Sequence, residues 1–172
     1  MEQFVEEILA IIKSKKTLKE KRKLLQKYHE NDIAEVIPHL SEKEKNDLFK
    51  ILNDEDLSEV ISYADDADKV IDGLNNDEVA DILEDMDSDD AVDILEDMDD
   101  KDRNDVLSKM EDEAREDATM ILSYPEDSIG RLMTTNYIVI NKDDTNTSAM
   151  KKLIKQSGDN DNITKIFVVD DN

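Results

Sequence analysis

Residues 77–99 read DEVADILEDMDSDDAVDILEDMD, and this stretch decides the fold. The heptapeptide DILEDMD occurs twice in it, at Asp81–Asp87 and at Asp93–Asp99, twelve residues apart. Each copy places apolar residues at i, i+3, i+4 and i+7, the period of a helix with one apolar stripe. These residues are Val79, Ile82, Leu83 and Met86, then Ala91, Ile94, Leu95 and Met98. We therefore expect two short helices, each with an apolar face in the core and an acidic face outside.

The same short rhythm extends on both sides of this duplication. Units of about 12 residues are too short to be stable alone in water, so they must stack on their neighbours. Thr17–Glu20 and Ser41–Glu44 are capping boxes that mark two helix starts, the first leading into a helix with Leu18 inward. Asn31 or Asp32 is the expected cap of a helix that stops near Pro38. We expect about ten stacked helices between residues 3 and 122, and the residue pattern leaves the hand of the stack open.

After Ser123 the pattern changes to that of a strand, a helix and a second strand. The strands are predicted at residues 137–140 and 163–169, with a helix near residues 148–155. Before them, Pro125 suits the first turn of one more helix, and Gly130 can end that helix or allow close packing. Two strands and one helix are too little for a domain, so this part is predicted to be a fragment of a second one.

Composition excludes several classes of protein. The chain has no Cys, which rules out disulfides, thiolate zinc sites and cysteine nucleophiles. The longest apolar run is five residues, against the roughly 20 that a membrane span needs, and the N-terminus lacks the basic region of a secretory signal. No nucleotide-binding loop or nucleophile–base pair appears, so no enzyme is expected. The two imidazoles, His29 and His39, are expected at helix ends or on the surface.

The net charge of −24 is concentrated in one segment. Residues 51–118 carry 5 basic and 28 acidic side chains, a net of −23. Such a surface repels nucleic acid and anionic membranes and attracts cations or a basic protein. Two roles stay open for the acidic face: a solvated surface that keeps the protein soluble, and a surface that binds cations.

Residues 124–134, YPEDSIGRLMT, resemble the signature that joins the two cytosolic domains of the MgtE family of magnesium transporters and channels. The acidic array of short helices before it resembles the N-terminal domain of that family. The resemblance implies a mostly α fold with a right-handed superhelix of about ten helices over residues 1–132. Residues 133–172 then correspond to the start of the first CBS domain, a truncated β-α-β unit.

The resemblance also implies a function, a ligand and partners. In the family, Mg²⁺ lies between the N domain and the CBS domains and keeps the pore closed, and loss of Mg²⁺ releases the N domain. The family's ligands correspond to Glu59, Asp89 and Asp93, with a backbone contribution near Arg131. The implied partners are the CBS domains and the transmembrane pore of a full-length homodimer, at the cytoplasmic face of the membrane.

The chemistry of these residues is compatible with Mg²⁺. Asp89 and Asp93 are i, i+4 on one helical face, where like charges cost about 0.2–0.5 kcal/mol that a divalent cation would remove. One rival is an EF-hand loop from Asp85 to Glu96, but Asp90 stands where that loop needs Gly, and the apolar stripe demands helix there. The rival from another class is an acidic helical scaffold that docks a basic protein.

Overall fold

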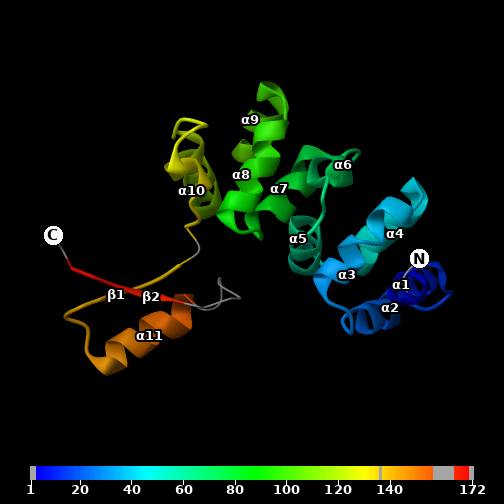
Figure 1. Ribbon diagram of the computed structural model, residues 1–172, viewed down its shortest axis with the longest axis horizontal. Helices are drawn as coiled ribbons and strands as arrows, with labels where there is room; N and C mark the ends of the chain where they lie inside the picture. The colour runs from blue at the N-terminus through cyan, green and yellow to red at the C-terminus, as the bar shows by residue number, and fades with distance from the viewer. Residues whose placement is uncertain (1–2, 136, 157–164, 171–172) are drawn as a thin grey trace.

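The computed structural model describes residues 3–135, 137–156 and 165–170, and over these residues the protein is mostly helical (Figure 1). The helices of the N-terminal part are α1 Gln3–Lys13, α2 Leu18–Leu25, α3 Glu30–Ala34, α4 Glu42–Ile51, α5 Asp54–Ser62, α6 Ala67–Ile71, α7 Asn76–Glu84, α8 Ser88–Asp97, α9 Asp100–Lys109 and α10 Asp112–Leu122. Short 3₁₀ turns occur at η1 Ile37–His39 and η2 Ile129–Leu132. The ten predicted stacked helices are therefore confirmed.

The helices stack in two rows, because most of them pack chiefly against the next helix but one. The odd row runs α1, α3, α5, α7 and α9, and the even row contains the pairs α2–α4, α6–α8 and α8–α10. Figure 1 shows the resulting array, with α1 and α2 at one end and α10 at the other. A chain of 12-residue units gains its stability in this way, from contacts between helices stacked in the same row.

The apolar stripes of the duplicated heptapeptide form the middle of one continuous core. Seven of the eight predicted stripe residues are buried, and Met98 is partly buried against the same core. The core extends from Val5 of α1 to Ile121 of α10. Each fully buried Leu or Ile contributes about 1.5–3 kcal/mol, which offsets the poor intrinsic stability of such short helices.

Helix ends follow the predicted caps with two corrections. The capping boxes of Thr17 with Glu20 and of Ser41 with Glu44 are both formed. The cap of α3 is His29 instead of Asn31 or Asp32, because the imidazole Nδ1 accepts the Asn31 N–H at 3.2 Å while the Asp32 carboxylate accepts the His29 N–H. Leu18 is 53% exposed, so its predicted inward orientation is wrong: it lies at the first position of α2, outside the stripe.

Two neighbouring side chains of α2 form hydrogen bonds to the C-terminal carbonyls of two other helices. Lys21 is buried and donates from Nζ to the carbonyl oxygen of Ile12 at 2.6 Å. Arg22 donates from Nε to the carbonyl oxygen of Ile51 at 2.5 Å. Both cations therefore lie at helix C-termini, of α1 and α4, where they satisfy unpaired carbonyls and the helix dipole.

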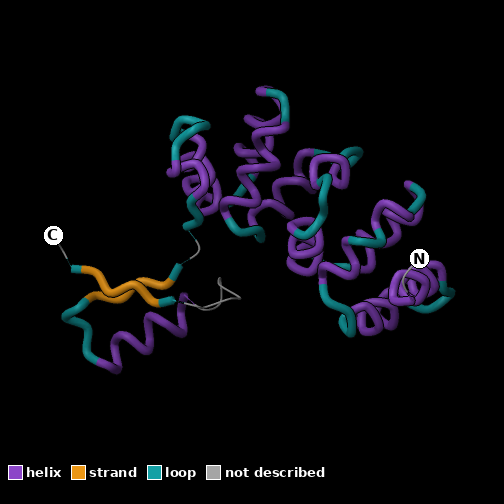
Figure 2. The backbone as a smooth tube through the Cα atoms, viewed as in Figure 1, coloured by secondary structure: helices purple, strands orange, loops and turns teal. Residues whose placement is uncertain are grey.

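The C-terminal part is a β-α-β unit, as predicted (Figure 2). β1 Ile138–Asn141 pairs in parallel with β2 Ile166–Val169, in the register Ile138 to Ile166, and α11 Asn146–Gln156 packs against β1. The first residues of the second predicted strand, 163 and 164, lie outside the described residues.

The segment between α10 and β1 corrects one sequence expectation. Pro125 begins a turn, closed by the Ser128 N–H on its carbonyl at 2.9 Å, and not a further α-helix. Gly130 lies in η2 and packs against the ring of Tyr124. Of its two predicted roles, ending a helix or allowing close packing, the second is therefore the correct one.

Candidate cation-binding face

Two of the predicted ligands, Asp89 and Asp93, lie on α8, one turn apart. Asp89 is half-buried and Asp93 is exposed. Although Asp93 is exposed, partial desolvation beside the helix raises the pKa of its carboxyl, and the neighbouring carboxylates of Glu96, Asp89 and Asp97 raise it further. The guanidinium of Arg131 opposes this shift in the pKa. The two predicted aspartates are therefore close enough to repel each other, as their spacing implied.

Asp90 is a third acid of this surface, which the ligand prediction did not include. Burial raises the pKa of its carboxyl, a hydrogen bond from Ser62 of α5 lowers it, and the charges of Asp89, Asp87 and Asp93 raise it. Its spacing of i, i+3 to Asp93 places both carboxylates on the same side of α8. That spacing is shared by other acids of the chain, so it did not single Asp90 out.

A shallow groove of about 220 Å³ lies between the α5–α6 connection and α8. Its acidic lining residues are Asp65, Asp68, Asp90, Asp93 and Asp97. No Lys or Arg occurs among the described residues that line it. We refer to Asp89 together with these five acids as the α8 acidic face.

Arg131 lies against the other end of α8 and uses its side chain structurally. The guanidinium forms an ion pair with Glu96 and donates from Nη1 to the carbonyl oxygens of Ile121, at 3.0 Å, and Tyr124, at 3.3 Å. Its side chain is only 11% exposed. These bonds hold the backbone of η2 beside α8. The backbone contribution near Arg131 that the resemblance implied would come from this segment.

Glu59, the third predicted side-chain ligand, lies on a different helix. It is half-buried on α5, one turn before Ser62, the residue that bonds to Asp90 on α8. Among the described residues, no group of three or more His, Asp or Glu side chains is arranged to hold a metal ion. The structure thus brings Asp89 and Asp93 together on one helix, with Arg131 beside that helix, and Glu59 on the helix that contacts it.

The first copy of the heptapeptide shows what differs at the second. Asp77, which corresponds to Asp89, forms an ion pair with Lys109 of α9 at 2.8 Å. Within the described residues no ion pair involves Asp89 or Asp93. The EF-hand alternative is wrong, because α8 begins at Ser88 and runs through the second half of the proposed loop.

Comparison with known proteins decides the family. The family described as the MgtE intracellular N domain matches residues 28–127, more than half of the chain. The chain belongs to the MgtE family. No curated protein gave a match. One solved structure, the soluble part of a magnesium transporter, shares the fold with a TM-score of 0.86 and 24% identity; the match covers 98% of this chain and 67% of that one.

A second solved structure is the cytosolic domain of the Mg²⁺ channel MgtE in complex with ATP. It matches with a TM-score of 0.74 and 24% identity over 88% of this chain. This chain spans 63% of the length of that domain. Both solved structures confirm the fold that the sequence predicted, a helical array followed by a β-α-β unit. No helix among the described residues is long and apolar enough to cross a membrane.

Proposed function

We propose that this chain is a non-catalytic, Mg²⁺-responsive regulatory part of a magnesium transporter or channel of the MgtE family. The observation that carries the proposal is the α8 acidic face. There, Asp89, Asp90 and Asp93 repel one another, partial desolvation already disfavours the charged forms of Asp90 and Asp93, and the lining of the groove supplies no basic partner among the described residues. Such a face lowers its free energy when a cation binds.

The residues fit Mg²⁺ as half of a site. Mg²⁺ takes oxygen ligands, commonly one or two carboxylates with water in its other positions. Asp89 and Asp93, one turn apart, can supply two such carboxylates from one rigid helix. Glu59 and the backbone near Arg131 are the further ligands that we propose, and acidic groups of the CBS domains would complete the shell. An incomplete shell on this chain alone gives weak binding, which suits a sensor of an abundant ion.

The gating role follows from the charge of the surface. With Mg²⁺ bound, the α8 acidic face and the CBS domains are held together, and the pore of the homodimer stays closed. Without it, the segment with a net charge of −23 repels other acidic surfaces, so the array of helices swings away. In this proposal the chain lies at the cytoplasmic face of the membrane.

The test is a Mg²⁺ titration of the chain, followed by backbone amide shifts at constant ionic strength. Saturable shifts confined to α8, α5 and η2 are expected. Asp89→Asn with Asp93→Asn should abolish them. The matched control is Asp77→Asn with Asp81→Asn, which makes the same charge change at the same spacing in the first copy of the repeat and should leave the shifts intact.

The competing proposal is an acidic scaffold that docks a basic protein, and the concentration of charge in residues 51–118 favours it. In that case Mg²⁺ only screens the surface. Small, non-saturating shifts spread over residues 51–118, equal in both pairs of variants, would support the scaffold and reject the sensor.

A further inference from the structure

One segment of this acidic chain is strongly basic. Residues 13–27 contain eight Lys or Arg side chains and one acid, a net of +7, in a chain whose total is −24. The single acid, Glu20, is occupied in the capping box with Thr17. The segment comprises the end of α1, the loop after it, α2 and the turn that follows.

Three of the eight basic side chains have structural partners. Lys21 and Arg22 bond to the carbonyls that end α1 and α4, and Lys13 forms an ion pair with Glu44 at 3.2 Å. The other five are exposed and form no ion pair within the described residues: Lys15, Lys16, Lys19, Lys23 and Lys27. Two of these five, Lys19 and Lys23, lie one turn apart on α2 and so share one helical face, and the other three lie in the loop before this helix and the turn after it.

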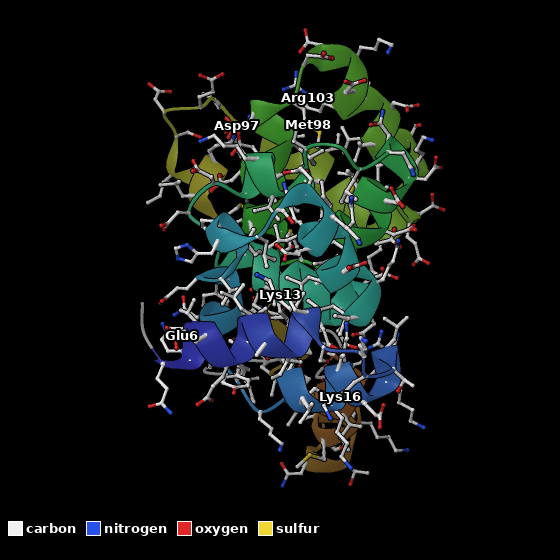
Figure 3. All side chains as sticks on the ribbon, turned by 90° about the vertical axis from the view of Figure 1, so that its right-hand side faces the viewer. Glu6, Lys13, Lys16, Asp97, Met98 and Arg103 are labelled. Carbon is white, nitrogen blue, oxygen red and sulfur yellow. The ribbon has the colours of Figure 1, made fainter. Side chains whose placement is uncertain are left out.

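An exposed apolar side chain lies among these lysines. Leu18 is 53% exposed at the first position of α2, between Lys16 and Lys19. We call Leu18 and the five exposed lysines the basic face. Figure 3 views the array from this end, with Lys16 in the lower part of the view and Asp97 of α8 in the upper part. Charges of opposite sign are therefore separated along the molecule.

We propose that the basic face binds the surface of an anionic phospholipid bilayer. The lysines contact lipid phosphates, and Leu18 inserts at the boundary between headgroups and acyl chains. Clustered lysines beside an apolar side chain are the usual composition of a surface that lies on a membrane. An acidic protein partner would use the same lysines but would leave Leu18 without a role.

Two physical points make the contact reasonable in an acidic protein. Screening limits the repulsion between lipid and the acidic segment to about 8 Å at physiological ionic strength, so the end that approaches the bilayer decides the interaction. If the chain is joined to a transmembrane pore, as proposed above, the bilayer is also held at a high effective concentration. The lipid contact itself does not require the Mg²⁺ site.

The experiment is co-sedimentation of the chain with vesicles in EDTA, so that Mg²⁺ does not bridge the acidic segment to lipid. Vesicles of phosphatidylcholine alone are compared with vesicles that also contain phosphatidylglycerol. Binding only to the anionic vesicles, and its loss at high salt, is expected. Each neutralised lysine should lower partitioning about fivefold. Lys15→Gln, Lys19→Gln, Lys23→Gln and Lys27→Gln together should therefore reduce binding to background.

The matched control changes four other exposed lysines to Gln: Lys43, Lys50, Lys151 and Lys155. It carries the same net charge as the first variant and should keep most of the binding. Leu18→Ser should weaken binding with the salt dependence unchanged. Equal binding by the two quadruple variants, or equal binding to both kinds of vesicle, overturns the proposal.

Two further measurements distinguish lipid binding from self-association and from Mg²⁺ sensing. Sedimentation without vesicles at low salt tests whether the basic face instead binds the acidic segment of a second copy; self-association that only the first quadruple variant loses would overturn the lipid assignment. The same variant should retain the Mg²⁺-dependent shifts of α8. A failure of lipid binding is thus distinguishable from a failure of Mg²⁺ sensing.

Discussion

The hydroxyl oxygen of Ser88 accepts the backbone N–H of Thr135 at 2.8 Å, and thereby ties the first residue of α8 to the segment that leads into β1. The hydroxyls of the two residues lie 2.9 Å apart, and that of Thr135 donates to Asp117 of α10 at 2.7 Å. Arg131 fastens the same segment to the other end of α8 through Glu96. The connection therefore lies along the helix that carries Asp89 and Asp93.

Ser88→Ala should destabilise the protein by about 1–3 kcal/mol, because it removes the buried hydroxyl that accepts the N–H of the half-buried Thr135. Urea unfolding followed by circular dichroism measures the change. The control is Ser108→Ala on α9, whose exposed hydroxyl bonds only to the carbonyl of Asp105, and it should cost less than about 0.5 kcal/mol. Equal effects would show that the Ser88–Thr135 contact contributes nothing.

Arg131→Met should lower the free energy of unfolding by about 2–4 kcal/mol. The Arg131 side chain is only 11% exposed, and its loss leaves the Glu96 carboxylate and two carbonyl oxygens without their donor. Arg103→Met removes an ion pair to Asp100 whose carboxylate is 90% exposed, and should cost under about 1 kcal/mol. The Arg131 variant should also raise the pKa of Asp93, measurable by carboxyl carbon shifts. An unchanged Asp93 titration would count against the electrostatic contact.

Asp90→Asn should stabilise the Mg²⁺-free protein at neutral pH by about 0.5–1 kcal/mol, a small effect because solvent screens a half-exposed group. Burial raises the pKa of Asp90 in the folded state, so the folded chain binds more protons than the unfolded one just above the ordinary value of about 4. Stability from this group therefore falls as pH rises through that window. The gain from Asn should vanish at pH values below it.

The charge-matched control for this titration is Asp81→Asn on the exposed side of α7. Thermal unfolding of both variants and of the unchanged chain, measured across the acid range, separates the two positions. A gain for Asp90→Asn that stays the same from acid to neutral pH would mean that the charge of Asp90 is not its source.

Gly130→Ala should destabilise the segment between α10 and β1 by about 1–3 kcal/mol. A Cβ at this position would lie 2.7 Å from a ring carbon of Tyr124, so the ring or the turn must move. Tyr124→Ala should remove most of the penalty in the double variant, which a double-mutant cycle on urea unfolding measures. Additive effects of the two substitutions would show that the ring is not the obstacle.

Periodicity predicted the helices because the core is built from local stripes, and Val79, Ile82 and Leu83 illustrate how completely they are buried. Periodicity did not predict the helix ends, because there a single contact decides which residue caps the helix. The imidazole of His29 caps α3 through Nδ1, and no sequence rule favours it over Asn31. Leu18 is apolar but lies outside the stripe of α2, so its exposure depends on helix phase.

The candidate site was predictable only where its residues share a helix. The i, i+4 spacing of Asp89 and Asp93 gives their proximity directly. Asp90 gains its raised pKa from burial against α5, and Ser62 reaches it from 28 residues earlier in the chain, so sequence alone could not single it out. The charge pairing of Asp77 with Lys109 likewise depends on how α9 packs against α7.

The two rows of helices are not equally continuous. The odd row runs from α1 to α9, but in the even row α4 and α6 share at most marginal contact within the described chain, and a groove of about 630 Å³ lies between the two sides. The Lys45 ammonium crosses it to the Lys69 carbonyl at 3.3 Å. Helices α1–α4 and α6–α10 should therefore open as separate cooperative units joined by α5, and amide hydrogen exchange should give each unit its own opening free energy.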